Sequence, residues 1–165
     1  MQTEKETISK SEALEQLNLA LRRAALLYHY FADTLIAEFG EDEGRRLILK
    51  AIGAYGAHIG KGAEKRAREK GLAAVPDNFQ DDLPRMAWKS EDIVVDEEKR
   101  TRIHHCPLAK VWQELGNPKH ARLYCFVDQA KMTAFNPDYT YVHLKNVLDG
   151  DPHCELVVRR NLSRE

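Results

Sequence analysis

Apolar residues recur at steps of three and four in the first part of the chain, the spacing of one face of an α-helix. Ser9 and Glu12 precede the pattern with the spacing of a capping box at a helix N-terminus, and Gly40 follows its last member. The apolar positions are Leu14, Leu17, Leu21, Ala24, Tyr28, Phe31, Leu35 and Phe39. The pattern predicts a long amphipathic helix that ends at Gly40.

A second helical pattern begins in the acidic residues 41–43 and continues to the basic residues before Gly71. Acidic residues at the start of a helix and basic residues at its end complement the helix dipole. Gly53, Gly56 and Gly60 interrupt the pattern, although each glycine costs a helix about 1 kcal/mol relative to alanine. They indicate close approach of another backbone or of a ligand, and close packing of helices is the simpler explanation.

The second half of the chain changes from helical to alternating patterns. Residues 93–95 and 101–105 flank a charged turn, and residues 139–147 and 153–160 flank an Asp-Gly pair, so two hairpins are predicted. Between them, Cys106-Pro107 starts one predicted helix that ends at Gly116, and Asn117-Pro118 starts another that runs to Ala130. Residues 72–84 form a predicted loop.

These elements predict an α+β protein, with long N-terminal helices packed on an antiparallel sheet that the two C-terminal hairpins form. The length of 165 residues fits one domain, 1–165. Within it, residues 1–71 form a helical region, and residues 86–165 form a hairpin-helix-hairpin region that carries the motifs discussed below.

Composition restricts the partners and the compartment. Lys and Arg (25) nearly balance Asp and Glu (26), so no nucleic-acid partner is expected. The polar N-terminus resembles no export signal, and no stretch approaches the roughly 18 apolar residues of a membrane span, so we expect a protein of the bacterial cytoplasm without a membrane partner. The apolar stripe of the first helix and the glycines of the second predict a homo-oligomer.

Three cysteines, an odd number, fit reduced thiols in that compartment. Cys106 starts a predicted helix, where free backbone N–H groups stabilise a thiolate, and His104 and His105 precede it. It is therefore a candidate nucleophile, although a cysteine is also often a buried helix cap.

Other candidate site residues lie further along the chain. Cys125 and Asp128 are three residues apart on a predicted helix and share a face, and a carboxylate among apolar neighbours requires a partner or a function. Asp128 could instead cap or pair locally. Cys154, at the start of a strand, is either a pocket residue or a buried core thiol. His143 either lines the same pocket or faces solvent.

The cysteines, the histidines and Asp128 form an adequate ligand set for a metal. The chain has neither a Cys-x-x-Cys nor a His-x-x-x-His pair, so no metal is predicted. Fingerprints of phosphate-binding loops, nucleophile elbows and dinucleotide sites are absent as well, so no cofactor is predicted.

The second half of the chain contains, in this order, HHCPLAKVW, LYCFVDQ and LDGDPHCEL. This order resembles the L-2-amino-thiazoline-4-carboxylic acid hydrolase family, in which a Cys-Pro, a Cys-x-x-Asp and a late Gly-Asp-x-x-Cys follow one another. The resemblance covers His104 to Leu156. It maps the motif of the family onto Cys106, Cys125, Asp128 and Cys154.

The resemblance implies a hydrolase that opens a small nitrogen-containing heterocycle at a carbon–nitrogen or carbon–sulfur position, converting a 2-amino-thiazoline carboxylate to an N-carbamoyl amino acid. In one mechanism the Cys106 thiolate, supported by His105, attacks the amidine-like carbon while Asp128 holds or protonates the ring nitrogen. In another, Asp128 activates water as a general base. Cys125, Cys154 and His143 then bind the substrate.

The ending GDPHCEL is also similar to the tail of the 4-vinyl reductase type of small-molecule-binding domain. This similarity implies a non-catalytic binding or sensory role as the alternative function. No residue in the sequence separates the two roles.

Overall fold

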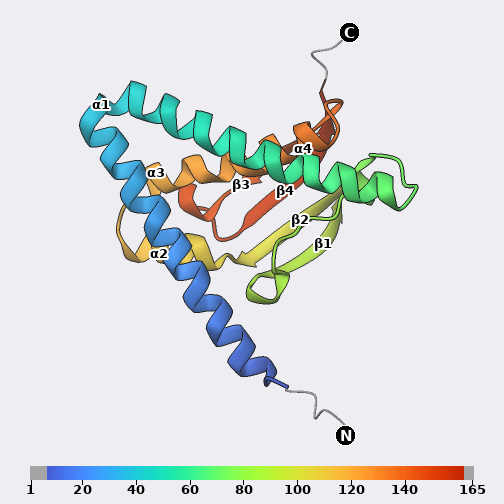
Figure 1. Cartoon of the computed structure of the whole chain (residues 1–165), viewed down its shortest axis with the longest axis horizontal. Coiled ribbons are helices and arrows are strands. Elements are labelled where there is room, and N and C mark those ends of the chain that lie inside the picture. Colours follow the sequence, from blue (N-terminus) through green and yellow to red (C-terminus); the bar gives the residue numbers. More distant parts are fainter. Residues whose placement is uncertain (1–6, 162–165) are drawn as a thin grey trace, which may run out of the picture.

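The computed structural model describes residues 7–161, so the first six residues of the polar N-terminus lie outside the described residues. Helices and strands follow one another as in Figure 1. They are α1 (Lys10–Glu69), β1 (Lys89–Val95), β2 (Glu98–His105), α2 (Pro107–Glu114), α3 (Pro118–Ala121), α4 (Phe126–Phe135), β3 (Tyr139–Lys145) and β4 (Cys154–Arg160). Short 3₁₀ turns stand at Pro76–Asn78, Arg85–Ala87, Arg122–Cys125 and Val147–Asp149.

Helix α1 consists of two arms, residues 10–39 and 41–69, that meet at a sharp bend (Figure 1). The Ser9 hydroxyl accepts a hydrogen bond from the backbone N–H of Glu12, as the capping motif predicts. Gly40 makes the bend with φ +78°, a conformation that side chains other than glycine rarely adopt. Gly71, with φ +69°, follows the end of the second arm. The two predicted helices and their ends are confirmed.

The four strands form one antiparallel sheet in the order β1-β2-β4-β3. β1 and β2 are joined by a tight turn in which Asp96 and Glu97 have φ of 50° and 65°, as the favoured two-residue hairpin turn requires. β4 pairs with β3 and also with β2, where Leu156 lies opposite Thr101, so the two predicted hairpins become one sheet. The α+β class with an antiparallel sheet from the C-terminal hairpins is confirmed.

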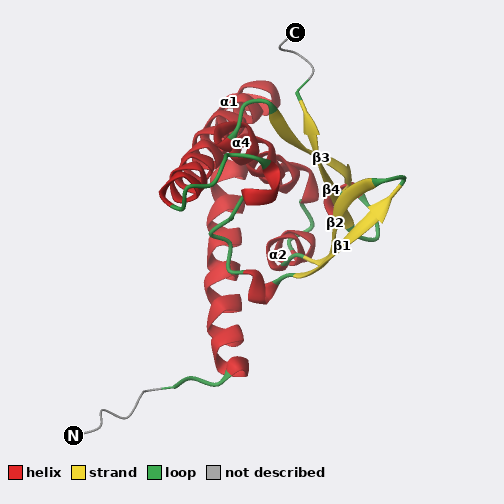
Figure 2. Cartoon of the chain, turned by 90° about the vertical axis from the view of Figure 1, so that its right-hand side faces the viewer, coloured by secondary structure: helices red, strands yellow, loops and turns green. Residues whose placement is uncertain are grey.

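Helix α4 lies between the second arm of α1 and the sheet, and Figure 2 shows these layers edge-on. Gly56 and Gly60 allow this close contact. A Cβ atom at Gly60 would lie 2.1 Å from the carbonyl oxygen of Lys131, and one at Gly56 would lie 2.6 Å from the Cβ of Ala130. Gly53 is less crowded, since its Cβ would meet only the Phe126 ring at 3.4 Å. Close helix packing is confirmed for Gly56 and Gly60.

Gly60→Ala is expected to destabilise the protein by about 3 kcal/mol, because the backbone of α4 has to move away from the new methyl group. Gly53→Ala is the matched control. There the methyl group has room, and the higher helix propensity of alanine is expected to stabilise the protein by up to about 1 kcal/mol. Urea unfolding of both variants measures the difference, and equal effects would contradict this account of the helix contact.

The single helix predicted from Asn117 to Ala130 is wrong in its detail. The structure divides this segment into α3, the 3₁₀ turn Arg122–Cys125 and α4, which continues to Phe135. The turn lies where the ring of Tyr124 packs against Tyr28 and Trp112, with centroid distances of 5.1 and 5.3 Å. Tertiary packing of this kind overrides the helical periodicity.

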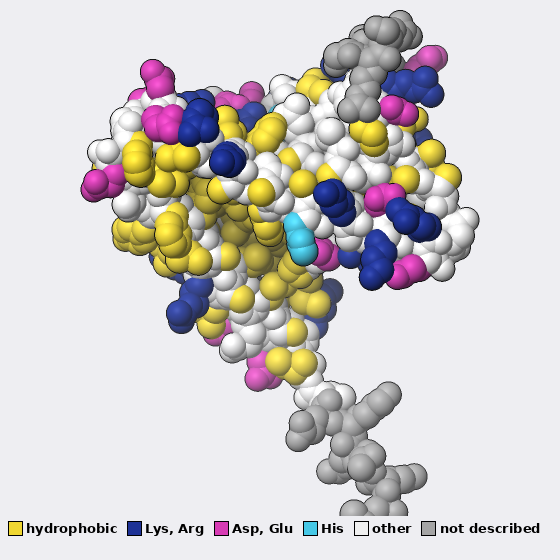
Figure 3. All heavy atoms as spheres, turned by 45° about the horizontal axis from the view of Figure 1, so that its top comes forward, with side chains coloured by type: hydrophobic (Ala, Val, Ile, Leu, Met, Phe, Trp, Pro, Cys, Tyr) yellow, Lys and Arg dark blue, Asp and Glu magenta, His cyan; other side chains and the backbone are white. Residues whose placement is uncertain are grey.

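Several large apolar side chains of α1 remain exposed, and Figure 3 shows a broad, partly hollowed apolar area on this face of the molecule. They are Leu19, Leu27, Tyr30, Phe31, Phe39 and Tyr55. Such an area is larger than scattered surface residues usually make. The homo-oligomer stays a prediction. Within residues 7–161, no helix combines the length and apolarity that crossing a membrane takes.

Candidate functional site

Asp128 and His143 form a hydrogen-bonded pair between α4 and β3. Asp128 Oδ2 lies 3.1 Å from His143 Nε2, and Asp128 Oδ1 lies 2.8 Å from the Nζ of Lys131. The same ammonium group lies 2.5 Å from Asp81 of the loop before β1. Sequence spacing accounts for part of this arrangement, because Asp128 and Lys131 are three residues apart and share a helix face.

The register of β3 turns His143 toward the helices. His143 pairs with Leu156 of β4, which is buried, and residues directly opposite in an antiparallel pair share one face of the sheet. Tyr141, two residues earlier, lies on the same face as His143. The structure therefore decides between the two orientations of His143 that periodicity left open.

The Asp128 carboxyl is ionised at any ordinary pH. Burial opposes its ionisation, but the charge of Lys131 and the hydrogen bond from His143 outweigh burial and lower its pKa to about 2. The pKa of Lys131 is raised, because Asp128 and Asp81 overcome the opposing effect of burial. The stabilisation from ionised Asp128 is complete above its unfolded pKa of about 4 and is lost as the pH falls through about 2.

Asn146 connects the histidine to a thiol. Its Nδ2 atom donates to the Sγ of Cys125 at 3.4 Å and lies 3.2 Å from the Nδ1 of His143. Its Oδ1 accepts from the backbone N–H of Leu148, and its own backbone N–H donates to Asp151, so this buried side chain is held in place. With its Nε2–H donated to Asp128, His143 carries its lone pair on Nδ1, toward Asn146.

Asn146 was missed in the sequence. A signal was present, because asparagine at a strand end often caps the following turn, as its bond to Leu148 does here. That signal predicts the turn and says nothing of the contact with Cys125 and His143.

An open pocket of about 510 Å³ lies against Cys125 and His143. Its lining is completed by Arg45, Leu49, Arg122, Leu123, Phe126, Gln129, Tyr141, Val142 and Asp149. Asp128 supports His143 without lining the pocket itself. The pocket therefore combines a histidine backed by a carboxylate, a thiol and two guanidinium groups beside apolar walls.

Burial keeps the Cys125 thiol protonated. It raises the pKa to about 12, even though the hydrogen bond from Asn146 and the charge of Arg122 act in the opposite direction. Cys154 is buried, and its Sγ accepts from the backbone N–H of Val147 at 3.5 Å. Burial raises the pKa of Cys154 as well.

Cys106 does not line the pocket. The backbone N–H groups of Ala109 and Leu108 favour its thiolate, as predicted for a helix start, but burial outweighs them and raises its pKa. No hydrogen bond among the described residues joins Cys106 to a histidine. His104 pairs instead with Glu91, and burial and nearby lysines lower the pKa of His105. The structure thus brings together Cys125, Asp128 and His143. Cys106 and His105 do not line the pocket, but Cys106 packs on the same hydrophobic cluster as Cys125 and is near enough to raise the pKa of that thiol.

A comparison with protein-family models matches residues 20–158 to L-2-amino-thiazoline-4-carboxylic acid hydrolase. The chain belongs to this family. The match extends beyond the motifs between His104 and Leu156 and includes most of α1, so the family covers both sides of the pocket, from Arg45 to His143. A comparison with curated proteins finds no match. In the described part of the chain, no three histidine, cysteine or acidic side chains converge as a metal site requires.

Proposed function

We propose that this member of the family hydrolyses a small 2-amino-thiazoline-type carboxylate in the pocket beside Cys125 and His143. The observation that carries the proposal is the His143–Asp128 pair at the pocket wall, with the carboxylate kept ionised by Lys131. An ionised carboxylate that fixes one ring nitrogen of a histidine leaves the other nitrogen as a base, which is the usual means of activating a nucleophile.

In the proposed reaction, water is the nucleophile. Water binds beside Asn146 at His143 Nδ1 and gives its proton to that nitrogen, and its oxygen bonds to the amidine carbon of the ring. The electron pair of the ring C=N bond moves to the ring nitrogen, which takes this first proton from His143. The hydroxyl on the carbon then gives its remaining proton to His143 and becomes the carbonyl, the carbon–sulfur bond breaks, and His143 passes this second proton to the departing sulfur. The product is an N-carbamoyl amino acid with a free thiol, and Asp128 stabilises the imidazolium formed on the way.

Water is favoured over a cysteine because of the pKa of the only thiol that lines the pocket. With a pKa of about 12, Cys125 is a thiolate at pH 7 in a fraction on the order of 10⁻⁵. Its Sγ is in contact with Asn146 and not directly with the base. The route through Cys106 stays a prediction from the sequence, but its sulfur lies outside the pocket lining.

The test is the release of a free thiol from 2-amino-thiazoline-4-carboxylate, followed with a thiol reagent and by chromatography of the product. Cys125→Ala is expected to keep turnover within about tenfold of the unchanged protein, because the thiol shapes the pocket and transfers no proton. Cys106→Ala is expected to change turnover less than Cys125→Ala does, because Cys106 does not line the pocket.

Loss of all turnover in a folded Cys125→Ala variant would assign the attack to the thiol. Saturable binding of the thiazoline without any product would instead support the binding or sensory role. Both results contradict the water mechanism.

A further inference from the structure

We infer that Arg122 and Arg45 form a subsite that binds the carboxylate of the ligand and so orients its ring toward His143. The inference rests on the proposed function only for the identity of the ligand. The two guanidinium groups line the same pocket although they come from segments far apart in the sequence, the second arm of α1 and the turn before α4.

Arg122 has free capacity for a second anion. Its Nε donates to Asp149 at 2.8 Å, and no other carboxylate hydrogen bond to it occurs in the described part of the chain. A guanidinium carries five N–H donors, so the bond to Asp149 and a contact with the Cys125 sulfur leave donors of Arg122 for a bound carboxylate. Asp149 is half exposed, and an ion pair in contact with solvent competes weakly with a bound ligand.

The guanidinium of Arg45 has fewer hydrogen-bonded acidic partners than that of Arg122. Its nearest carboxylate, Glu41, lies 3.6 Å away, beyond hydrogen-bond distance. Glu41 already pairs with Lys119 at 2.9 Å and faces His120 at 3.4 Å. One carboxylate therefore serves several basic groups, which leaves Arg45 without a hydrogen-bonded acidic partner among the residues described.

The rest of the pocket fits a small ring with one acidic substituent. Apart from the two arginines and Asp149, the lining is largely apolar or aromatic, with walls from Leu49, Leu123, Phe126 and Val142. Apolar walls with a few polar groups that fix orientation are typical of small-molecule sites. A heterocyclic carboxylate satisfies both parts of this lining.

The test compares 2-amino-thiazoline-4-carboxylate with its carboxamide in Arg122→Gln and Arg45→Gln, with Arg46→Gln as the matched control. Arg46 is the next residue in α1, pairs with Glu43 and does not line the pocket. Loss of a charge-assisted hydrogen bond is expected to raise KM for the carboxylate roughly ten- to a hundredfold in each pocket variant, with little change for the carboxamide and none in Arg46→Gln.

Calorimetric binding of thiazolidine-4-carboxylate, which lacks the amidine group that hydrolysis needs, separates this inference from the proposed function. Binding that weakens in the two pocket variants supports the subsite even if no substrate is turned over. Equal losses for the carboxylate and the carboxamide, in variants with unchanged unfolding temperature, would overturn it. So would thiazolidine-4-carboxylate binding that is unaffected by either substitution.

Discussion

Asp128→Asn is expected to lower kcat for thiazoline hydrolysis roughly a hundredfold to ten-thousandfold, the range over which a general base contributes to catalysis. The neutral amide no longer favours the His143 tautomer with its proton on Nε2, and it no longer stabilises the imidazolium. The fold is expected to persist, because Lys131 keeps its ion pair with Asp81. His143→Gln should cause a loss of the same order, since it removes the base itself.

The control is Asp138→Asn, an exposed aspartate between α4 and β3, which is expected to leave kcat unchanged. Because the pKa of Asp128 is about 2, this carboxylate stays ionised throughout the pH range of an ordinary assay. An acidic limb in the pH–rate profile of the unchanged protein therefore cannot come from Asp128. Near-normal kcat in both Asp128→Asn and His143→Gln would remove the pair from the mechanism.

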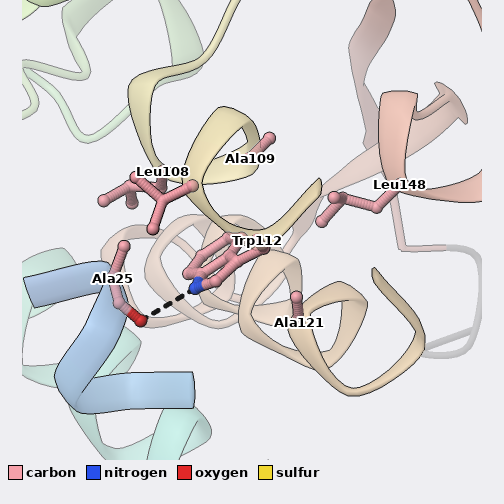
Figure 4. Packing of buried hydrophobic residues seen from close by; sticks show 7 residues of the cluster. Ala25, Leu108, Ala109, Trp112, Ala121 and Leu148 are labelled. Atoms are coloured by element: carbon pink, nitrogen blue, oxygen red, sulfur yellow. Dashed lines mark hydrogen bonds between the residues drawn. The ribbon is translucent and has the colours of Figure 1, made fainter. Parts of the chain in front are cut away.

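Trp112→Ala is expected to destabilise the protein by about 3–5 kcal/mol, the range for removing a large buried aromatic side chain. Trp112 is 1% exposed and lies in the cluster that joins the first arm of α1 to α2 (Figure 4). Its indole Nε1–H donates to the carbonyl of Ala25 at 2.9 Å, and its ring lies 5.4 Å from that of Tyr28. The substitution leaves a cavity and removes the indole hydrogen bond to Ala25, whose carbonyl keeps only its backbone partner within α1.

Urea unfolding measures the effect, with Val94→Ala of β1 as the control. Val94 is 70% exposed, so its truncation is expected to change stability by no more than about 0.5 kcal/mol. The loss of stability in Trp112→Phe should fall between those of Trp112→Ala and Val94→Ala, because this variant keeps an aromatic ring and loses only the hydrogen bond and some volume. If Trp112→Ala lowers the free energy of unfolding no more than Val94→Ala does, this cluster does not stabilise the packing of the first arm of α1.

Most of the fold could be predicted because its signals are local. The cap at Ser9, the helix end at Gly40 and the helix start at Pro107 each depend on a few neighbouring residues. A short charged turn likewise predicted the first hairpin, and the Asp-Gly turn predicted the second. The division of the segment around Cys125 into a 3₁₀ turn and α4 was not predictable, since it depends on Tyr124 packing against residues far away in the sequence.

The sequence alone also identified Cys125, Asp128 and His143 as candidates, because residue type and spacing suffice to name them. Only the tertiary structure decided that they meet, that Asn146 connects them, and that Arg45 and Arg122 complete the pocket. Cys106 shows why the sequence could not decide such properties of the site. Its local features favour a thiolate, but burial depends on how the helices pack on the sheet, and burial exceeds the effect of the helix start on its pKa.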